Sequence, residues 1–229
     1  MQLLPYAILD MDGTLLDSSG MWDVVSEQVL APWGKVCTSR EREDTMTMTV
    51  DGTAAYYVQH FSLPIPPEQM AASIRQHARR AYATLARVKP GVPQALDAMR
   101  ARGVTLCVAS GTEKPLVDAA LEQFGILDRF AFTLDCVTPR GKEEPEVYLR
   151  AAERFGAKPA QIMVFEDSPT AVATAHKAGF YTVGVLDSYT RPHWEQVRAS
   201  ADAVLDSWTE WTRQLDCPQP GFARKQQNG

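Results

Sequence analysis

The sequence has few residues that could form disulfides or bind zinc. Its four cysteines, Cys37, Cys107, Cys136 and Cys217, are far apart and form no Cys-x-x-Cys pair. Neither the cysteines nor the four histidines have the ligand spacing of a zinc site. We therefore expect all four cysteines to be reduced thiols, as is usual in a cytoplasmic protein.

The sequence also lacks the features of membrane, secreted and nucleic-acid-binding proteins. No apolar run is long enough to cross a bilayer, and the first residues contain no basic region followed by an apolar core. The net charge of -5 gives no electrostatic attraction to nucleic acid or to an anionic membrane. We expect a cytoplasmic protein with neither a nucleic-acid nor a membrane partner. The sequence does not indicate its oligomeric state.

The pattern of apolar residues divides the chain into two regions of different character. Residues 6–9 form an apolar run that is typical of a buried strand. From about residue 17 to residue 86 the apolar residues have helical spacing, and we expect a small helical domain inserted after the first strand. After residue 87 strands alternate with helices, which predicts an α/β fold with a parallel sheet covered on both faces.

The region after residue 87 predicts a regular succession of strands and helices. Strands, or short apolar runs, are expected at residues 104–109, 130–134, 162–165, 181–186 and 203–205. Helices are expected at residues 92–102, 115–124, 145–155, 169–178 and 208–215. Glycine follows four of these helices, as is common at helix C-termini.

Two carboxylates, Asp10 and Asp12, follow the first apolar run and precede Gly13. An Asp-Gly pair between apolar runs is also a strong hairpin signal, so this motif alone leaves both a turn and a functional site open. In an open parallel sheet, ligands bind outside the carboxyl ends of the strands. The two carboxylates would repel each other at such an end unless a cation shared the site.

Polar residues also follow other predicted strands or precede a predicted helix. They are Ser110, Gly111, Lys142, Glu166 and Asp167. If the strands are parallel, these residues and the two aspartates meet at one edge of the sheet. The set suits a phosphate ester and Mg²⁺, because Mg²⁺ prefers carboxylate and phosphate oxygens and a lysine supplies a compact positive charge. One carboxylate could be the nucleophile and another could transfer protons.

These residues resemble the motifs of the haloacid dehalogenase superfamily, in its phosphatase branch with a helical cap. The four motifs appear in the family's order at residues 9–18, 108–112, 141–142 and 164–168. The match covers nearly the whole chain, including the inserted helical region. The resemblance implies a Rossmann-like core formed by residues 1–16 and 87–229 and a helical cap formed by residues 17–86.

The resemblance implies catalytic roles for three residues. Asp10 corresponds to the nucleophile, which forms an aspartyl-phosphate intermediate and also binds Mg²⁺. Asp12 corresponds to the acid/base, and its backbone carbonyl would also reach the metal. Lys142 would neutralise the phosphoryl oxygens and orient Asp10.

The resemblance also implies which residues bind phosphate and metal. Ser110 would bind the phosphoryl group with help from the N–H of Gly111. Asp167 corresponds to a metal ligand. Glu166 corresponds either to a direct metal ligand or to a residue behind the ligands, and the sequence leaves both open.

We therefore expect a magnesium-dependent phosphatase that hydrolyses a small-molecule phosphate monoester. One alternative is a phosphomutase of the β-phosphoglucomutase type. Those relatives carry a histidine in the first cap segment, whereas this chain has Trp22 in that stretch and no histidine before His60. A dehalogenase is disfavoured because dehalogenases lack the acid that is Asp12 here. A non-catalytic binding protein on the same scaffold is a further alternative, although every catalytic group is retained.

Residues 45–52 are the expected specificity segment of the cap. They join two helical stretches and combine hydroxyl groups with two methionines. Thr47 and Thr49 are the candidate substrate contacts, and Gly52 is a candidate hinge. The alternative, equally favoured, is that the two methionines pack inside the cap.

Overall fold

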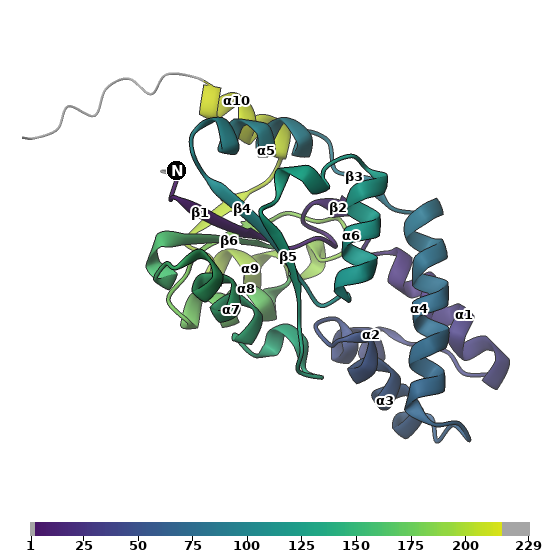
Figure 1. Cartoon of the computed structure of the whole chain (residues 1–229). Coiled ribbons are helices and arrows are strands. Elements are labelled where there is room, and N and C mark those ends of the chain that lie inside the picture. Colours follow the sequence, from purple (N-terminus) through teal and green to yellow (C-terminus); the bar gives the residue numbers. More distant parts are fainter. Residues whose placement is uncertain (1–2, 217–229) are drawn as a thin grey trace, which may run out of the picture.

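Six parallel strands form the central sheet of the computed structural model, which describes residues 3–216 (Figure 1). The strands are β1 Tyr6–Leu9, β4 Thr105–Ser110, β5 Phe132–Asp135, β6 Ile162–Glu166, β7 Tyr181–Val185 and β8 Ala203–Leu205. Their order is β5-β4-β1-β6-β7-β8, so β1 pairs with β4 on one side and β6 on the other. This interior place explains the apolar sequence of β1, because an interior parallel strand is buried on both faces.

Helices cover both faces of the sheet, as the alternating pattern predicted. One face packs against α5 Val92–Ala101, α6 Lys114–Gln123 and α10 Trp208–Asp216. The other face packs against α7 Glu146–Phe155 and α8 Pro169–Lys177, with α9 Trp194–Ser200 beside α8. The predicted bounds of α5, α6, α7, α8, α10 and the strands differ from the observed ones by no more than one or two residues, whereas α9 was not predicted. The predicted α/β fold is thus confirmed.

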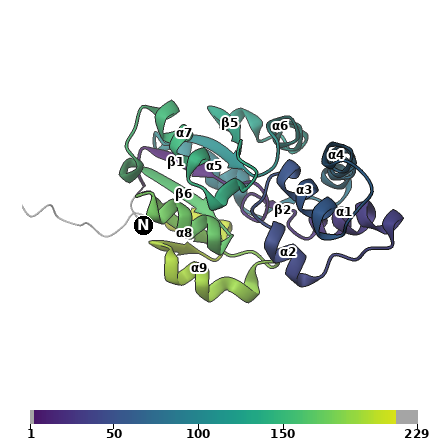
Figure 2. The same ribbon diagram turned by 90° about the horizontal axis from the view of Figure 1, so that it is seen from below.

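Four helices follow one another along the chain between two short strands. The first of these strands comes shortly after β1, and the second comes after the last of the four helices. The strands β2 Leu16–Asp17 and β3 Arg87–Val88 pair antiparallel and join the group to the central sheet. The helices are α1 Met21–Leu30, α2 Ser39–Thr45, α3 Val50–His60 and α4 Pro67–Thr84. Figures 1 and 2 show them together on one side of the molecule, with α4 beside α6.

The helix α2 is not recognisable from its apolar pattern. Its sequence, SREREDT, contains no apolar residue, so it has no apolar spacing from which a helix could be predicted. Its start is stabilised instead by a capping interaction, in which the side chain of Glu41 accepts hydrogen bonds from the backbone N–H of Thr38, at 2.8 Å, and from its hydroxyl. A capping pair of this kind is the sequence signal that could have revealed the helix.

The cysteines of the described residues agree with the expectation of reduced thiols. Cys37, Cys107 and Cys136 are buried and free, while Cys217 lies outside the described residues. Within residues 3–216 the structure contains no helix that is both long enough and apolar enough to span a bilayer.

The C-terminal helix supports the loop that follows β1. The indole N–H of Trp208 donates a hydrogen bond to the carbonyl oxygen of Thr14 at 2.9 Å. The indole ring stacks on Phe165 of β6, with ring centroids 5.4 Å apart. Trp208 is almost fully buried, so the Thr14 carbonyl has its donor in a place where water is largely excluded. A residue late in the chain therefore stabilises the loop next to Asp10 and Asp12.

We expect Trp208→Phe to lower the free energy of unfolding by about 1–3 kcal/mol, because the variant leaves the buried Thr14 carbonyl without its donor. Urea unfolding followed by far-ultraviolet circular dichroism measures this change. The matched control is Trp194→Phe, at a half-buried position of α9. An equal loss of stability in both variants would show that the hydrogen bond to Thr14 is not the cause.

Candidate active site

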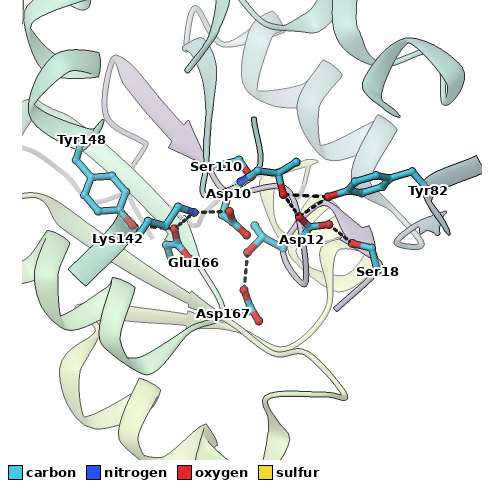
Figure 3. Close-up of polar contacts among 11 residues, drawn as sticks. Asp10, Asp12, Ser18, Tyr82, Ser110, Lys142, Tyr148, Glu166 and Asp167 are labelled. Carbon is cyan, nitrogen blue, oxygen red and sulfur yellow. Dashed lines mark hydrogen bonds and ion pairs between the residues drawn. The ribbon is translucent and has the colours of Figure 1, made fainter. Parts of the chain in front are cut away.

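The carboxyl ends of β1, β4 and β6 bring the predicted polar residues to one edge of the sheet (Figure 3). Asp10 follows β1, and its backbone N–H donates to the carbonyl oxygen of Phe165 in β6 at 3.0 Å. Ser110 is the last residue of β4 and Glu166 the last of β6. Because β1 lies between the other two strands, the parallel register alone places these side chains next to one another.

Lys142 reaches this edge from the short helix η3 Gly141–Glu143. Its ammonium group forms ion pairs with Asp10 and, at 2.5 Å, with Oε1 of Glu166. The hydroxyl of Tyr148 on α7 donates to the same Glu166 oxygen at 2.8 Å. Burial alone would lower the pKa of Lys142, but the carboxylates of Asp10 and Glu166 outweigh it and raise this pKa above its usual value. The charged form of Lys142 is therefore favoured beside Asp10.

Three buried acids form a cluster that could hold a metal ion. Oxygen atoms of Asp10, Glu166 and Asp167 lie within 4.8 Å of one another. Burial, and then the charges of Asp10 and Glu166, raise the pKa of Asp167 well above its usual value. Burial also raises the pKa of Glu166, to about 7, although Lys142 acts against this. Carboxylates in this state are ionised together most easily when a cation lies between them.

The space beside Asp167 depends on a glycine. Gly13 has a positive φ of 80°, and a Cβ built on it would lie 2.4 Å from Oδ2 of Asp167. A side chain at this position would therefore collide with the carboxylate. The carboxylate donors and the space kept by Gly13 fit Mg²⁺, which prefers oxygen ligands.

Asp12 lies beside Asp10 but is directed to other partners. Figure 3 shows Asp10 directed toward Lys142, and Asp12 toward Tyr82 and Ser18. Oδ1 of Asp12 accepts a hydrogen bond from Ser18 at 2.5 Å, and Oδ2 accepts from Tyr82 at 2.7 Å and from Thr112 at 3.1 Å. Burial and the charge of Asp10 nevertheless raise the pKa of Asp12, which favours its protonated form.

A cavity of about 150 Å³ connects this edge of the sheet with the helices α1–α4. The sheet side is lined by the predicted residues Asp10, Asp12, Ser110, Gly111, Lys142, Glu166 and Asp167. The helical side combines apolar residues such as Val25 and Ile74 with the charged residues Asp23 and Arg42. Asp23 accepts a hydrogen bond from Tyr189 at 2.8 Å and pairs with Arg42 at 3.5 Å. The cavity therefore has buried carboxylates and a lysine at the sheet end, and both apolar and charged side chains at the helical end.

The structure corrects part of the expectation for residues 45–52. Thr47 and both methionines line the cavity. Thr49 has another role, because its hydroxyl accepts a hydrogen bond from the N–H of Gly52 at 3.1 Å and thereby caps the first turn of α3. Gly52 is part of that helical turn rather than a loop hinge. A Cβ on Gly52 would lie 2.2 Å from the carbonyl oxygen of Pro139, so its small size permits a close backbone contact.

Four polar residues of the site are not identifiable from the sequence. They are Asp23, Arg42, Tyr82 and Tyr189. They come from α1, α2, α4 and the loop after β7, and no local motif connects them. Only the packing of the helices on the sheet brings these side chains to the same place.

Comparison with known proteins agrees with the geometry. Residues 6–179 match the family model of haloacid dehalogenase-like hydrolases. A probable pseudouridine-5'-phosphatase of Drosophila melanogaster is 31% identical over 214 residues, which are 90% of this chain and 90% of that protein. Hexitol phosphatase B of Escherichia coli K12 is 28% identical over 214 residues, which are 90% of this chain and 93% of the relative.

Solved structures show the same fold. CbbY from Rhodobacter sphaeroides, in complex with phosphate, has a TM-score of 0.80 at 23% identity, covering 94% of this chain and 100% of that chain. A putative beta-phosphoglucomutase from Thermotoga maritima has a TM-score of 0.67 at 23% identity, covering 93% and 99%. The family resemblance of the sequence motifs is confirmed: this chain belongs to the haloacid dehalogenase-like hydrolases, and its relatives place it among their phosphatases.

Proposed function

We propose that this protein hydrolyses a small-molecule phosphate monoester through a phosphorylated Asp10 and requires Mg²⁺. The observation that carries the proposal is the convergence of Asp10, Lys142, Ser110 and Asp167 on one cavity at the edge of the sheet. Residues 17–86 would act as a cap over a core formed by residues 1–16 and 87–229. The cap would exclude water from the site and contact the leaving group.

The two aspartates of the first motif would share the chemistry. The carboxylate of Asp10 attacks phosphorus, the bond from phosphorus to the leaving oxygen breaks, and Asp12 gives its proton to that oxygen. Water then attacks the aspartyl phosphate while Asp12 takes a proton from the water. This step releases inorganic phosphate and restores Asp10. The raised pKa of Asp12 supports its role as the acid of the first step.

The other polar residues would bind and orient the reacting groups. Ser110 and the N–H of Gly111 would bind the phosphoryl oxygens, and Lys142 would balance their charge. Asp10, Asp167 and the backbone carbonyl of Asp12 would hold Mg²⁺. When bound, Mg²⁺ supplies positive charge that favours the approach of an anionic carboxylate to an anionic ester.

We assign Glu166 to a position behind the metal ligands. One of its oxygens accepts hydrogen bonds from both Lys142 and Tyr148. These contacts fix the ammonium group of Lys142 between Glu166 and Asp10. Glu166 would therefore act on the reaction mainly by orienting Lys142.

The alcohol part of the substrate would be a sugar, a polyol or a nucleoside. Asp23, Arg42, Tyr189 and Thr47 offer hydrogen-bonding groups, and apolar residues beside them offer a surface for carbon atoms or a ring. The names of two relatives, a pseudouridine-5'-phosphatase and a hexitol phosphatase, support alcohols of this kind. Thr47 remains a candidate specificity residue, while Thr49 would act only through the shape of α3.

Asp10→Asn is expected to reduce phosphate release by several powers of ten, because the amide is a poor nucleophile and the covalent step is lost. Release of inorganic phosphate from 4-nitrophenyl phosphate measures the rate, and circular dichroism checks the fold. The control is Asp128→Asn, a strongly exposed aspartate of η2, which should keep the wild-type rate. Near-normal turnover by a folded Asp10→Asn variant would contradict the proposed nucleophile.

Removal of divalent metal is expected to stop the hydrolysis of the same ester, and added Mg²⁺ is expected to restore it. The Mg²⁺ concentration that gives half the maximal rate should rise in Asp167→Asn, which weakens one ligand. The control is Asp97→Asn, because Asp97 is exposed and pairs with Arg129 on the surface. This variant should need the same Mg²⁺ concentration as the wild type. An undiminished rate in excess chelator would exclude the metal-dependent mechanism.

Arg42→Ala is expected to change substrate preference, because its guanidinium group lines the cavity beside Asp23. The ratio of kcat/KM for pseudouridine 5'-phosphate or sorbitol 6-phosphate to that for 4-nitrophenyl phosphate should shift about tenfold, which corresponds to about 1.4 kcal/mol. Arg40→Ala, at an exposed position of the same helix, is the matched control. An equal ratio in both variants would move substrate recognition away from α2.

A further inference from the structure

Tyr82 connects the helical region with the proposed acid/base. It lies near the end of α4 and is almost fully buried. Its hydroxyl donates a hydrogen bond to Oδ2 of Asp12 at 2.7 Å and lies 3.1 Å from the hydroxyl of Thr112. The edge of its ring meets Trp22 of α1, with ring centroids 6.1 Å apart. The ring is therefore held by the helical region, while the hydroxyl contacts the core.

Three hydroxyl groups hold the carboxyl group of Asp12, and they come from different parts of the chain (Figure 3). Ser18 directly follows β2, and Tyr82 lies shortly before β3. Thr112 belongs to the loop after β4, a strand of the central sheet. The two strands β2 and β3 are the connections between the helical region and the sheet. The orientation of Asp12 therefore depends on how the helical region is seated on the core.

Asp12 lines the cavity. Tyr82 does not line it, but donates its hydrogen bond to Asp12 from α4. A hydrogen bond at this place restricts rotation of the carboxyl group. General acid catalysis depends on such restriction, because the proton must be within hydrogen-bonding distance of the leaving oxygen. A small displacement of the acid would lower the rate of proton transfer without removing the substrate's other contacts.

We propose that Tyr82 is a positioning residue, which holds Asp12 for proton transfer to the leaving oxygen when the helical region is seated on the core. This inference rests on the proposed role of Asp12 as the acid. Through the hydroxyl of Tyr82, proton transfer by Asp12 would depend on the position of the helical region. Tyr82 itself does not carry the proton.

The proposal predicts a dependence on the leaving group. A 4-nitrophenolate ion leaves without protonation, whereas an unsubstituted phenolate ion benefits more from the acid. The two esters, 4-nitrophenyl phosphate and phenyl phosphate, have the same phosphoryl group and similar size. Their kcat/KM values report the steps up to departure of the leaving group, and so they isolate the step in which Asp12 acts as an acid.

Tyr82→Phe keeps the ring and removes only the hydroxyl. We expect kcat/KM for phenyl phosphate to fall about tenfold more than kcat/KM for 4-nitrophenyl phosphate, a part of the factor that general acid catalysis supplies. The matched control is Tyr56→Phe, because Tyr56 donates its hydroxyl hydrogen bond to Asp44 on the surface of the helical region. The control should keep the wild-type ratio of the two esters.

Asp12→Asn separates this proposal from the proposed function. Asp12→Asn is expected to lower kcat/KM for phenyl phosphate more than kcat/KM for 4-nitrophenyl phosphate. If it does so, but Tyr82→Phe lowers both values equally or changes neither, Tyr82 has no positioning role. If Asp12→Asn itself leaves the ratio of the esters unchanged, the assignment of Asp12 as the acid fails. An equal change of the ratio in Tyr56→Phe and Tyr82→Phe would also overturn the proposal.

Discussion

The burial of several like charges at the edge of the sheet is the constraint on which the site depends. Asp10, Glu166 and Asp167 are buried acidic side chains, and the ammonium group of Lys142 pairs with the first two. A buried charge is costly unless it has a partner and hydrogen bonds. The contacts of Lys142 and Tyr148 with Glu166 offset part of the free energy that burial of these charges costs. A divalent cation would offset the remainder, so the stability of the site is connected with its proposed metal requirement.

A second constraint is the close backbone contact between the helical region and the core. The N–H of Lys142 donates to the carbonyl oxygen of Thr47 at 3.2 Å, and the N–H of Thr49 donates to that of Pro139 at 3.3 Å. A Cβ on Gly141 would lie 1.9 Å from the Thr47 oxygen, and its φ of 56° also favours glycine. The segment that carries Lys142 is thus joined directly to the helical region. The arrangement of the helices therefore affects both Lys142 and Asp12.

Much of the fold could be predicted because its signals are local. The apolar run of β1 and the glycines after several helices indicated strands and helices at nearly their observed places. The helix α2 lacked such a signal, since an apolar stripe is absent from its short sequence. Asp10 and Asp12 alone left a hairpin and a functional site open. The parallel pairing of β1 with β4 and β6 settles the geometry, because it brings Ser110 and Glu166 to the same edge.

By itself the sequence determined most of the strands and helices and which polar residues end the strands, because periodicity and turn residues act over a few neighbouring positions. Only the tertiary structure decided several of the partners within the site. Asp12 meets Tyr82, 70 positions away, and Asp23 meets Tyr189, 166 positions away. Such hydrogen bonds depend on how α1 and α4 pack against the core, and no pattern along the chain indicates that they form. Thr49 shows the same limit: its hydroxyl is used by the helix that it caps, which only the backbone conformation reveals.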